Sequence, residues 1–282
     1  MRFSRFSSAV LSVVLLVTPL VCKAWNAEGH MVVAKIAYDR LQPNVRAKVD
    51  AMVTVFSKEY PDLTDFVQIA SWPDAIRSQK IESFTHWHYV DLPITADNLP
   101  TKNITDTDNA VWALNTLEPV VHNEHANPYE RARFLAFLVH IVGDLHQPMH
   151  AVSRISLSHP DGDAGGNLFS VQWNQNGVHK TNLHHIWDEG LGVFTTKETL
   201  SNVDELAKAI TALYPESSFQ NVTDLKPSDW AEESNSDAKI AYETPENELP
   251  SSRYIIDGKN ISGQRVALAG YRLAALLNQL LK

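Results

Sequence analysis

The chain has 282 residues, enough for one large domain or two small ones, and 44% of them are hydrophobic, which can supply a sizeable core. It contains 33 acidic and 24 basic residues, so its formal net charge is −9 at pH 7. This acidity argues against a broad surface for phosphate groups, because nonspecific binding of nucleic acids depends on clustered lysine and arginine.

The first 24 residues have the pattern of a cleaved secretory signal. Arg2 and Arg5 form a basic start, an apolar run covers residues 9–21, and Ala24 supplies a small residue at the end. The apolar run is too short to favour a membrane anchor. The sequence therefore predicts a signal peptide over 1–24, cleavage after Ala24, and a secreted or periplasmic protein.

The alternative is a lipoprotein anchored through Cys22, but Val21 before it is larger than a lipoprotein cleavage site normally accepts. Cleavage after Ala24 would remove three basic residues and no acidic residue, so the net charge would change from −9 to −12. It would also remove the only cysteine. An exported chain of this size without a disulfide is expected to depend on packing or on bound metal for its stability.

The part of the chain that follows the signal reads as a series of helices. Apolar residues at helical spacing predict helices over 32–41 and 45–53, which Pro43 separates. Residues 57–72 have the composition of a loop. Asp108 is expected to cap the next helix.

A strong helix start precedes the most apolar stretch of the chain. Asn127 suits the N-cap, Pro128 the first helical position and Glu130 the third. Almost every position over 134–145 is apolar, so this helix has no clearly polar face and should be buried. Pro148 lacks a backbone N–H and is expected to end or kink the helix.

This apolar helix nevertheless carries His140 and Asp144, which are four residues apart and therefore lie on one side of it. A buried carboxylate costs on the order of several kcal/mol unless it is paired or bound to a metal. His150 follows just beyond the predicted kink. The stretch therefore predicts a metal site in the core of a helical protein.

The remaining elements are mostly helical as well. We expect a turn over 161–167, a short hairpin through Val171 and Trp173 that turns at Asn176-Gly177, a helix over 182–188, a helix capped by Asn202 with Glu205, a helix opened by Trp230, and a last helix over 266–280. No repeat, low-complexity tract or linker divides the chain. The sequence therefore predicts one all-α domain over 25–282 with a short β-hairpin.

A second pair of ligand-type residues, His184 and Asp188, repeats the spacing of His140 and Asp144. One such pair is weak evidence for a metal site, because chance pairs are common on solvated helix faces. Two pairs together with His150 are considerably stronger evidence. Neutral imidazole and carboxylate ligands together suit zinc.

Several short motifs together resemble those of the S1/P1 nucleases, which are secreted tri-zinc enzymes that cleave single-stranded nucleic acids and remove 3′-phosphates from nucleotides. The motifs are Trp25 with His30, WPDAIR at 72–77, WHYVD at 87–91, HIVGDLHQPMH at 140–150, GGN at 165–167, NLHHIWD at 182–188 and RLAALLN at 272–278. The resemblance covers essentially the whole mature chain and implies a phospholipase C/P1 nuclease-like fold. Fungal and plant members carry disulfides, whereas the mature chain here has no cysteine.

The resemblance implies three Zn2+ ions at the bottom of a cleft. The first would be held by Asp74, His88, His140 and Asp144, the second by His150, His184 and Asp188, and the third by Trp25, His30 and Asp144. Trp25 would bind through its free α-amine and its carbonyl oxygen, so an uncleaved chain would offer an amide nitrogen there, which is a very poor ligand. Asp144 would bridge two ions, which explains a carboxylate in the most apolar helix.

The resemblance also implies a mechanism and the residues that bind the substrate. A water shared by the first two ions would lose a proton near neutral pH, attack phosphorus in line and leave 5′-phosphates. Asp74 would also orient this water, and Arg77 and Asn167 would contact the phosphate. Tyr89 and Asp91 would form a base pocket, and stacking on an aromatic face requires an unpaired base. Single-stranded DNA, RNA and 3′-nucleotides are the expected substrates of a monomer without a membrane anchor.

Two alternatives remain at the level of the sequence. A zinc-dependent phospholipase C has a similar fold and cluster, but such lipases usually place Glu at the position of Asp188, and an aromatic-plus-carboxylate pocket suits a base better than choline. A non-catalytic zinc-scavenging protein would need the ligands, but it would have no use for Arg77 and Asn167 beside an open metal face.

Overall fold

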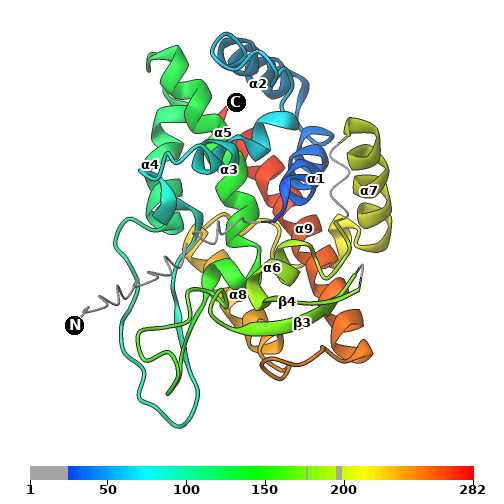
Figure 1. Ribbon diagram of the computed structural model, residues 1–282. Coiled ribbons are helices and arrows are strands. Elements are labelled where there is room, and N and C mark those ends of the chain that lie inside the picture. The colour runs from blue at the N-terminus through cyan, green and yellow to red at the C-terminus, as the bar shows by residue number, and fades with distance from the viewer. Residues whose placement is uncertain (1–24, 176, 195–198) are drawn as a thin grey trace, which may run out of the picture.

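The computed structural model describes residues 25–175, 177–194 and 199–282, so the predicted signal peptide and Asn176 of the predicted hairpin turn lie outside the described residues. The elements are α1 (Ala27–Tyr38), α2 (Pro43–Phe56), η1 (Gln68–Ser71), α3 (Trp72–Ser78), η2 (Thr85–His88), β1 (Pro93–Thr95), α4 (Ala110–His122), α5 (Pro128–Leu145), η3 (Pro148–Ala151), β2 (Ser153–Ile155), β3 (Ser170–Asn174), β4 (Val178–Asn182), α6 (Leu183–Asp188), α7 (Leu200–Leu213), η4 (Glu216–Ser218), α8 (Pro227–Ala241) and α9 (Ser252–Leu280). Helices predominate (Figure 1), which confirms the predicted all-α class.

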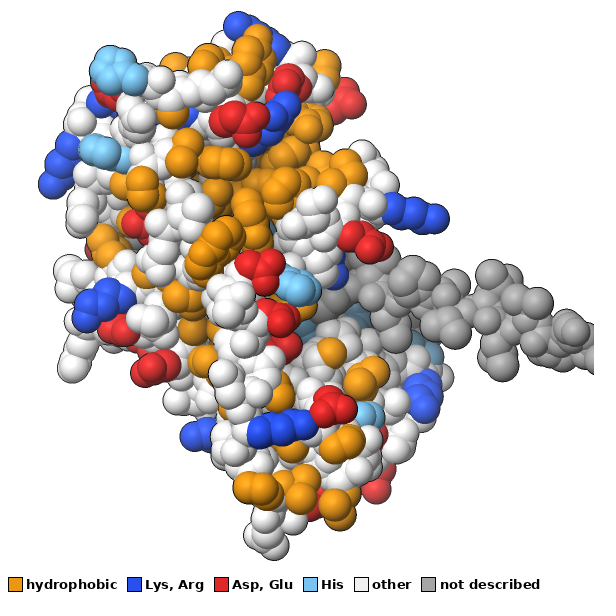
Figure 2. Space-filling view, turned by 90° about the vertical axis from the view of Figure 1, so that its left-hand side faces the viewer, with side chains coloured by type: hydrophobic (Ala, Val, Ile, Leu, Met, Phe, Trp, Pro, Cys, Tyr) orange, Lys and Arg blue, Asp and Glu red, His pale blue; other side chains and the backbone are white. Residues whose placement is uncertain are grey.

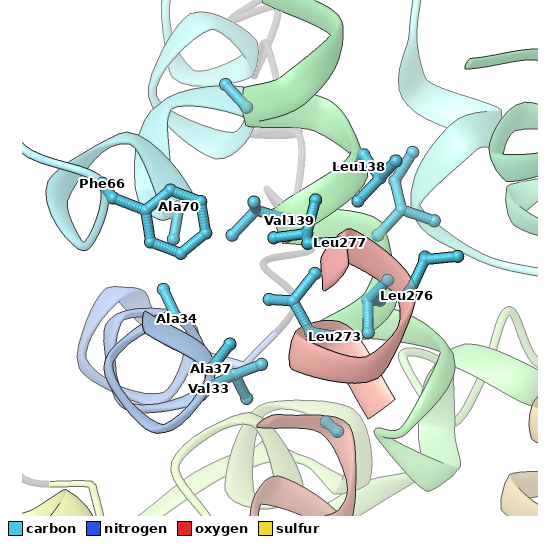
Figure 3. Packing of buried hydrophobic residues seen from close by; sticks show 14 of the residues in the cluster. Val33, Ala34, Ala37, Phe66, Ala70, Leu138, Val139, Leu273, Leu276 and Leu277 are labelled. Carbon is cyan, nitrogen blue, oxygen red and sulfur yellow. The ribbon is translucent and has the colours of Figure 1, made fainter. Parts of the chain in front are cut away.

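The core lies where α1, α5 and α9 meet. In Figure 3, Val33 and Ala37 of α1 point toward Leu273 of α9, and Val139 of α5 closes the cluster from the other side. Helix α1 approaches α9 closely, because a Cβ atom at Gly270 would lie only 2.5 Å from a methyl carbon of Ile36. The apolar stripes of three helices are therefore buried against one another, and the position of α5 is fixed by its neighbours on both sides.

The strands form two separate pairs within the described residues. β3 and β4 are antiparallel, which confirms the predicted hairpin, and Val171 pairs with Thr181 in their register. β1 and β2 form a short parallel pair that the sequence did not predict, because three-residue strands leave no periodic signal. A second apolar cluster under the hairpin contains Leu183 and Trp187, and it holds α6 in place.

Two of the three predicted helix caps are corrected by the structure. Asn127 caps α5 as predicted, with its side chain accepting backbone N–H groups of the first turn. Asp108 does not cap α4, because the neighbouring Asn109 occupies the N-cap and accepts two backbone N–H groups. Asn202 lies inside α7, whose N-cap is Thr199. In both cases a residue with the same capping chemistry stands nearby, one position after Asp108 and three before Asn202, and the residue at the helix boundary takes the role.

Other helix bounds also differ from the predicted ones. α8 begins at Pro227 rather than at Trp230, since proline is favourable at the first helical position. α9 begins at Ser252, well before the apolar pattern that predicted it over 266–280, because its first part is half exposed. Every helix in the described part of the chain is too short or too polar to span a bilayer.

Charged side chains are mixed on the face that carries α4. Among the described residues in Figure 2, acidic and basic side chains are interspersed and form no continuous basic field, while hydrophobic side chains gather in the upper part of the view. On this face, the mixed charges therefore form no broad basic surface among the described residues.

Candidate metal centre

Helix α5 delivers two predicted ligands to the interior. His140 and Asp144 are both fully buried on one face of the helix. The helix ends at Leu145, and the turn that starts at Pro148 brings His150 back toward the same region, where its Nδ1 lies 4.0 Å from Asp144 Oδ1. The apolar helix and its proline therefore place three ligand-type side chains together.

Two more predicted ligands come from the segment that precedes β1. His88 ends η2, and its Nδ1 lies 3.2 Å from Asp144 Oδ2 and 2.9 Å from His140 Nε2. Asp74 stands in the first turn of α3, and its Oδ1 lies 3.7 Å from His88 Nδ1 and 3.8 Å from His140 Nε2. The four residues predicted for the first ion therefore converge on one point.

His30 of α1 joins this cluster on its other side. Its Nε2 lies 3.3 Å from Asp144 Oδ1, and its ring stacks on that of His140 with centroids 3.8 Å apart. A Cβ atom at Gly143 would lie 2.8 Å from His30 Nδ1, so α1 can approach α5 this closely only because α5 has glycine here. Asp144 therefore offers one oxygen to His88 and His140 and the other to His30.

The three residues predicted for the second ion form a separate group. His184 and Asp188 come from α6, and His150 comes from η3. His184 Nε2 lies 3.0 Å from His150 Nε2, and Asp188 Oδ1 lies 3.5 Å and 3.6 Å from these two nitrogens. All three side chains are buried.

Main-chain carbonyl groups orient three of the imidazole rings. The Nδ1 atom of His140 donates to Ala70 O at 2.7 Å, that of His150 to His88 O at 2.6 Å, and that of His184 to Gly165 O at 2.7 Å. These bonds assign the proton of the neutral ring to Nδ1, which leaves a lone pair on Nε2. When both rings are neutral, the facing Nε2 atoms of His150 and His184 cannot hydrogen-bond to each other, and a shared cation between them would satisfy both lone pairs.

The unpaired polar atoms of the first cluster point to the same conclusion. Within the described residues, both ring nitrogens of His30, Oδ1 of Asp74 and both oxygens of Asp144 are buried without a hydrogen bond of acceptable geometry. Such atoms cost about 1–3 kcal/mol each when nothing satisfies them. Three groups of buried ligand atoms lie close enough to bind ions: His30 with His140 and Asp144, Asp74 with His88 and His140, and His150 with His184 and Asp188. The residues present therefore fit bound metal ions.

The electrostatic environment keeps two of these ligands in metal-binding states. Burial would raise the pKa of Asp144, but the neighbouring histidines His140, His30 and His88 hold that pKa well below its usual value. Burial lowers the pKa of His150 to about 3. Asp144 is therefore an anion and His150 a neutral imidazole at neutral pH, which are the forms that bind metal.

The pKa of His140 moves in the opposite direction. Burial would lower it, but the Asp144 and Asp74 carboxylates outweigh burial and raise it to about 9 in the absence of metal. A metal ion placed between the same carboxylates would displace this proton, because a ligating imidazole must be neutral.

Trp25 is held beside this cluster. Its ring is fully buried, and its Nε1 donates to Gly143 O at 3.0 Å, next to Asp144 in the chain. The following residue, Asn26, donates its backbone N–H to Asp188 O at 3.0 Å and caps α1 with its side chain. Trp25 therefore lies between the elements that carry both metal groups, while its role as a ligand stays a prediction.

The predicted substrate residues line one pocket next to His184. This pocket has a volume of about 260 Å³. Its lining consists of Arg77, Thr85, Tyr89, Asp91, Met149, Ala164, Gly165, Asn167, Leu168 and His184. Burial, with the nearby Asp106 and Asp163 carboxylates, raises the pKa of Asp91 to about 7. A larger pocket of about 460 Å³ between α1, α2 and α7 contains none of the predicted site residues.

The sequence missed residues that act on the ligands or line the pocket. Gln147 is fully buried, donates from Nε2 to Asp188 Oδ1 at 2.6 Å and accepts from Met149 N at 2.6 Å. It lies inside the 140–150 motif, and its position between two ligands was the signal available for it. Met149 and Leu168 line the pocket, but apolar residues give no such signal.

Comparison with known proteins agrees with this geometry. Residues 25–282 match the S1/P1 nuclease family. The chain is 30% identical to Endonuclease 1 of Arabidopsis thaliana, with 96% of this chain and 91% of the relative aligned. It is 27% identical to Nuclease S1 of Aspergillus oryzae over 90% of this chain and 91% of the relative. It is 28% identical to Nuclease P1 of Penicillium citrinum over 58% and 57%. The predicted resemblance is confirmed: the chain belongs to the S1/P1 nuclease family and is a hydrolase that acts on phosphodiester bonds.

Proposed function

We propose that this nuclease holds three zinc ions, cleaves single-stranded DNA and RNA internally to 5′-phosphate products, and removes phosphate from 3′-nucleotides. The observation that carries the proposal is the position of the three buried His/Asp groups beside a pocket lined by Arg77 and Asn167. Because the family is one of nucleases, the phospholipase and zinc-scavenging alternatives lose their support.

Zinc is the metal that this donor set favours. The ligands are imidazoles and carboxylates without a thiolate, and two nitrogens bound to one tetrahedral zinc lie about 3.3 Å apart. The corresponding distance between His150 and His184 is 3.0 Å. We assign the first ion to Asp74, His88, His140 and Asp144, the second to His150, His184 and Asp188, and the third to His30, Asp144 and Trp25.

When bound, zinc would supply Lewis acidity and activate water near neutral pH. Asp74 would orient that water, since its buried Oδ1 lies at the first cluster and accepts no hydrogen bond from the described residues. The guanidinium of Arg77 would bind two phosphate oxygens through its planar fork. Asn167, whose Nδ2 donates to Ala164 O at 2.8 Å and which lines the same pocket, would contact the same phosphate.

Tyr89 and Asp91 would select unpaired bases. A base can stack on the ring of Tyr89 only when it has left a duplex, which favours single strands. Asp91, with its pKa of about 7, can accept hydrogen bonds from a base edge when ionised and donate one when protonated. The pocket would therefore hold the base while Arg77 and Asn167 hold the phosphate.

Export would complete the site. Cleavage after Ala24 would free the α-amine of Trp25, which is already held beside Gly143 by its ring. The mature protein, 25–282, would then act as a secreted or periplasmic monomer.

The test is zinc stoichiometry and turnover of a chain that starts at Trp25. Three zinc ions, cleavage of a single-stranded oligonucleotide with 5′-phosphate ends, release of phosphate from 3′-AMP and no hydrolysis of phosphatidylcholine are expected. Arg77→Ala should abolish turnover without loss of zinc, whereas the control Arg253→Ala, on an exposed side chain paired with Asp257, should change neither. Lipid hydrolysis alone, or full turnover in Arg77→Ala, would refute the proposal.

A further inference from the structure

The loop over 161–167 has an unusual backbone and contacts the candidate site twice. Gly162, Ala164, Gly165 and Gly166 have φ angles of 97°, 53°, 63° and 79°, a region that residues with a side chain rarely adopt. Ala164 adopts it despite its Cβ atom. A loop in this conformation persists only when surrounding contacts impose it.

Two residues of this loop contact groups that we propose to act in metal or substrate binding. Gly165 O accepts the Nδ1 proton of the ligand His184, and Asn167 lines the pocket. A Cβ atom at Gly165 would lie 2.4 Å from Met149 O and 3.1 Å from His184 Nδ1. A displacement of the loop would therefore move a proposed phosphate contact and release the ring of a proposed zinc ligand.

One buried carboxylate organises this loop from within. Asp163 is 1% exposed, and its Oδ1 accepts from Arg154 N at 2.9 Å and from Gly166 N at 3.1 Å. Its own carbonyl oxygen accepts from Leu168 N at 3.1 Å. Hydrogen bonds from main-chain N–H groups to a carboxylate are stronger than those to a neutral acceptor. The side chain of Asp163 thus joins the loop to β2.

The carboxylate is in turn held by a side chain from a distant part of the chain. Tyr242, which follows α8, donates its hydroxyl to Asp163, with Oδ2 at 2.8 Å and Oδ1 at 3.0 Å. Its ring packs edge-on against Phe169, and the guanidinium of Arg154 lies 5.2 Å above it. Burial and the Asp163 charge raise the pKa of Tyr242 well above its usual value, so the hydroxyl keeps its proton.

We propose that Tyr242 is a positioning residue of this nuclease: through Asp163 it holds the 161–167 loop so that Asn167 meets the substrate and Gly165 orients His184. The proposal rests on the function proposed above for Asn167. It predicts that loss of the tyrosine hydroxyl affects turnover rather than folding, because the ring and its packing remain.

The first test compares Tyr242→Phe with Tyr271→Phe. Tyr271 of α9 is also buried, and its hydroxyl donates to Tyr214 O at 2.7 Å, which lies outside the 161–167 loop. With a single-stranded oligonucleotide, Tyr242→Phe should lower kcat about tenfold, as misplaced groups do, and leave KM within about twofold. Its zinc content should equal that of the control, and its Tm should be only a few degrees lower, because the lost hydrogen bond is to a carboxylate rather than to a carbonyl group. Unchanged kcat, or a fall that is matched by loss of zinc and Tm, would overturn the proposal.

The second test is a double-mutant cycle with Asn167→Ala. If Tyr242 acts through the loop, Tyr242→Phe should lower kcat far less in the Asn167→Ala background than in the parent. If Asn167→Ala lowers kcat and the two effects multiply, the positioning role of Tyr242 is wrong while the proposed role of Asn167 stands. If Asn167→Ala leaves kcat unchanged, the proposed role of Asn167 is wrong, and the coupling proposed here is wrong with it.

Discussion

Asp144→Asn tests whether one carboxylate serves two ions. Asp144 is fully buried, with Oδ2 3.2 Å from His88 and Oδ1 3.3 Å from His30, so its replacement should weaken both of the ion sites that we propose it shares. An ion present at 100 times its Kd stabilises the folded protein by about 2.7 kcal/mol, so the loss of two ions would cost about 5 kcal/mol. For a domain of this size, that corresponds to a fall in Tm of about 10–20 °C.

The assay is thermal unfolding of the parent and of the Asp144→Asn variant with excess zinc and again after chelation, beside elemental analysis. The fall in Tm should be large with zinc and should shrink after chelation, because the parent then loses the same ions. Asp50→Asn, at an exposed carboxylate that accepts from Tyr38 at 2.9 Å, is the control and should change neither the zinc content nor the response to chelation. An equal fall in Tm with and without zinc would show that Asp144 stabilises the fold independently of metal, and the proposed bridging of two ions would be wrong.

Two further substitutions test the surroundings of the ligands. Gln147→Glu keeps the acceptor for Met149 N but places a carboxylate oxygen against Asp188. The affinity for zinc, measured by competition with a chelator, should therefore fall about 10–100-fold. An unchanged affinity would show that Gln147 does not support the metal ligands. Gly165→Ala should destabilise the protein by about 1–3 kcal/mol in denaturant unfolding. The loss of stability should be larger than for the control Gly177→Ala, where φ is also positive at 105° but no atom lies within 4 Å of the added Cβ. Equal losses would show that the close contact with Met149 O at Gly165 contributes nothing to the destabilisation.

Part of the candidate site was predictable from spacing alone, and the rest only from the family resemblance. His140 and Asp144 stand one turn apart in a helix that is otherwise apolar, and His184 and Asp188 repeat the spacing. The structure brings both pairs to the interior, as the spacing predicts. The all-α class was predictable from the helical spacing of apolar residues, because any helix that buries one face shows this spacing in its sequence.

The contacts between distant segments were not predictable. Arg272 is fully buried and pairs at 2.7 Å with Glu233 of α8, although both look like surface residues in the sequence. Tyr242 meets Asp163 across 79 positions. Such pairs depend on the register between helices, which composition and spacing leave open in a single sequence. The caps at Asn109 and Thr199 were missed for a local reason, since a residue with the same capping chemistry lies within three positions of each.

The acceptors that orient His140, His150 and His184 are all main-chain oxygens, at Ala70, His88 and Gly165. A substitution at any of these positions replaces a side chain and keeps the carbonyl group. A substitution at one of these positions can therefore change the orientation of a ring only if it moves the backbone. The hydrogen bonds that orient the candidate metal ligands thus tolerate changes of side chain at these positions. To change the orientation of these imidazole rings by design, one would have to rebuild the segments that carry the acceptor oxygens, because exchanging their side chains leaves those oxygens in place.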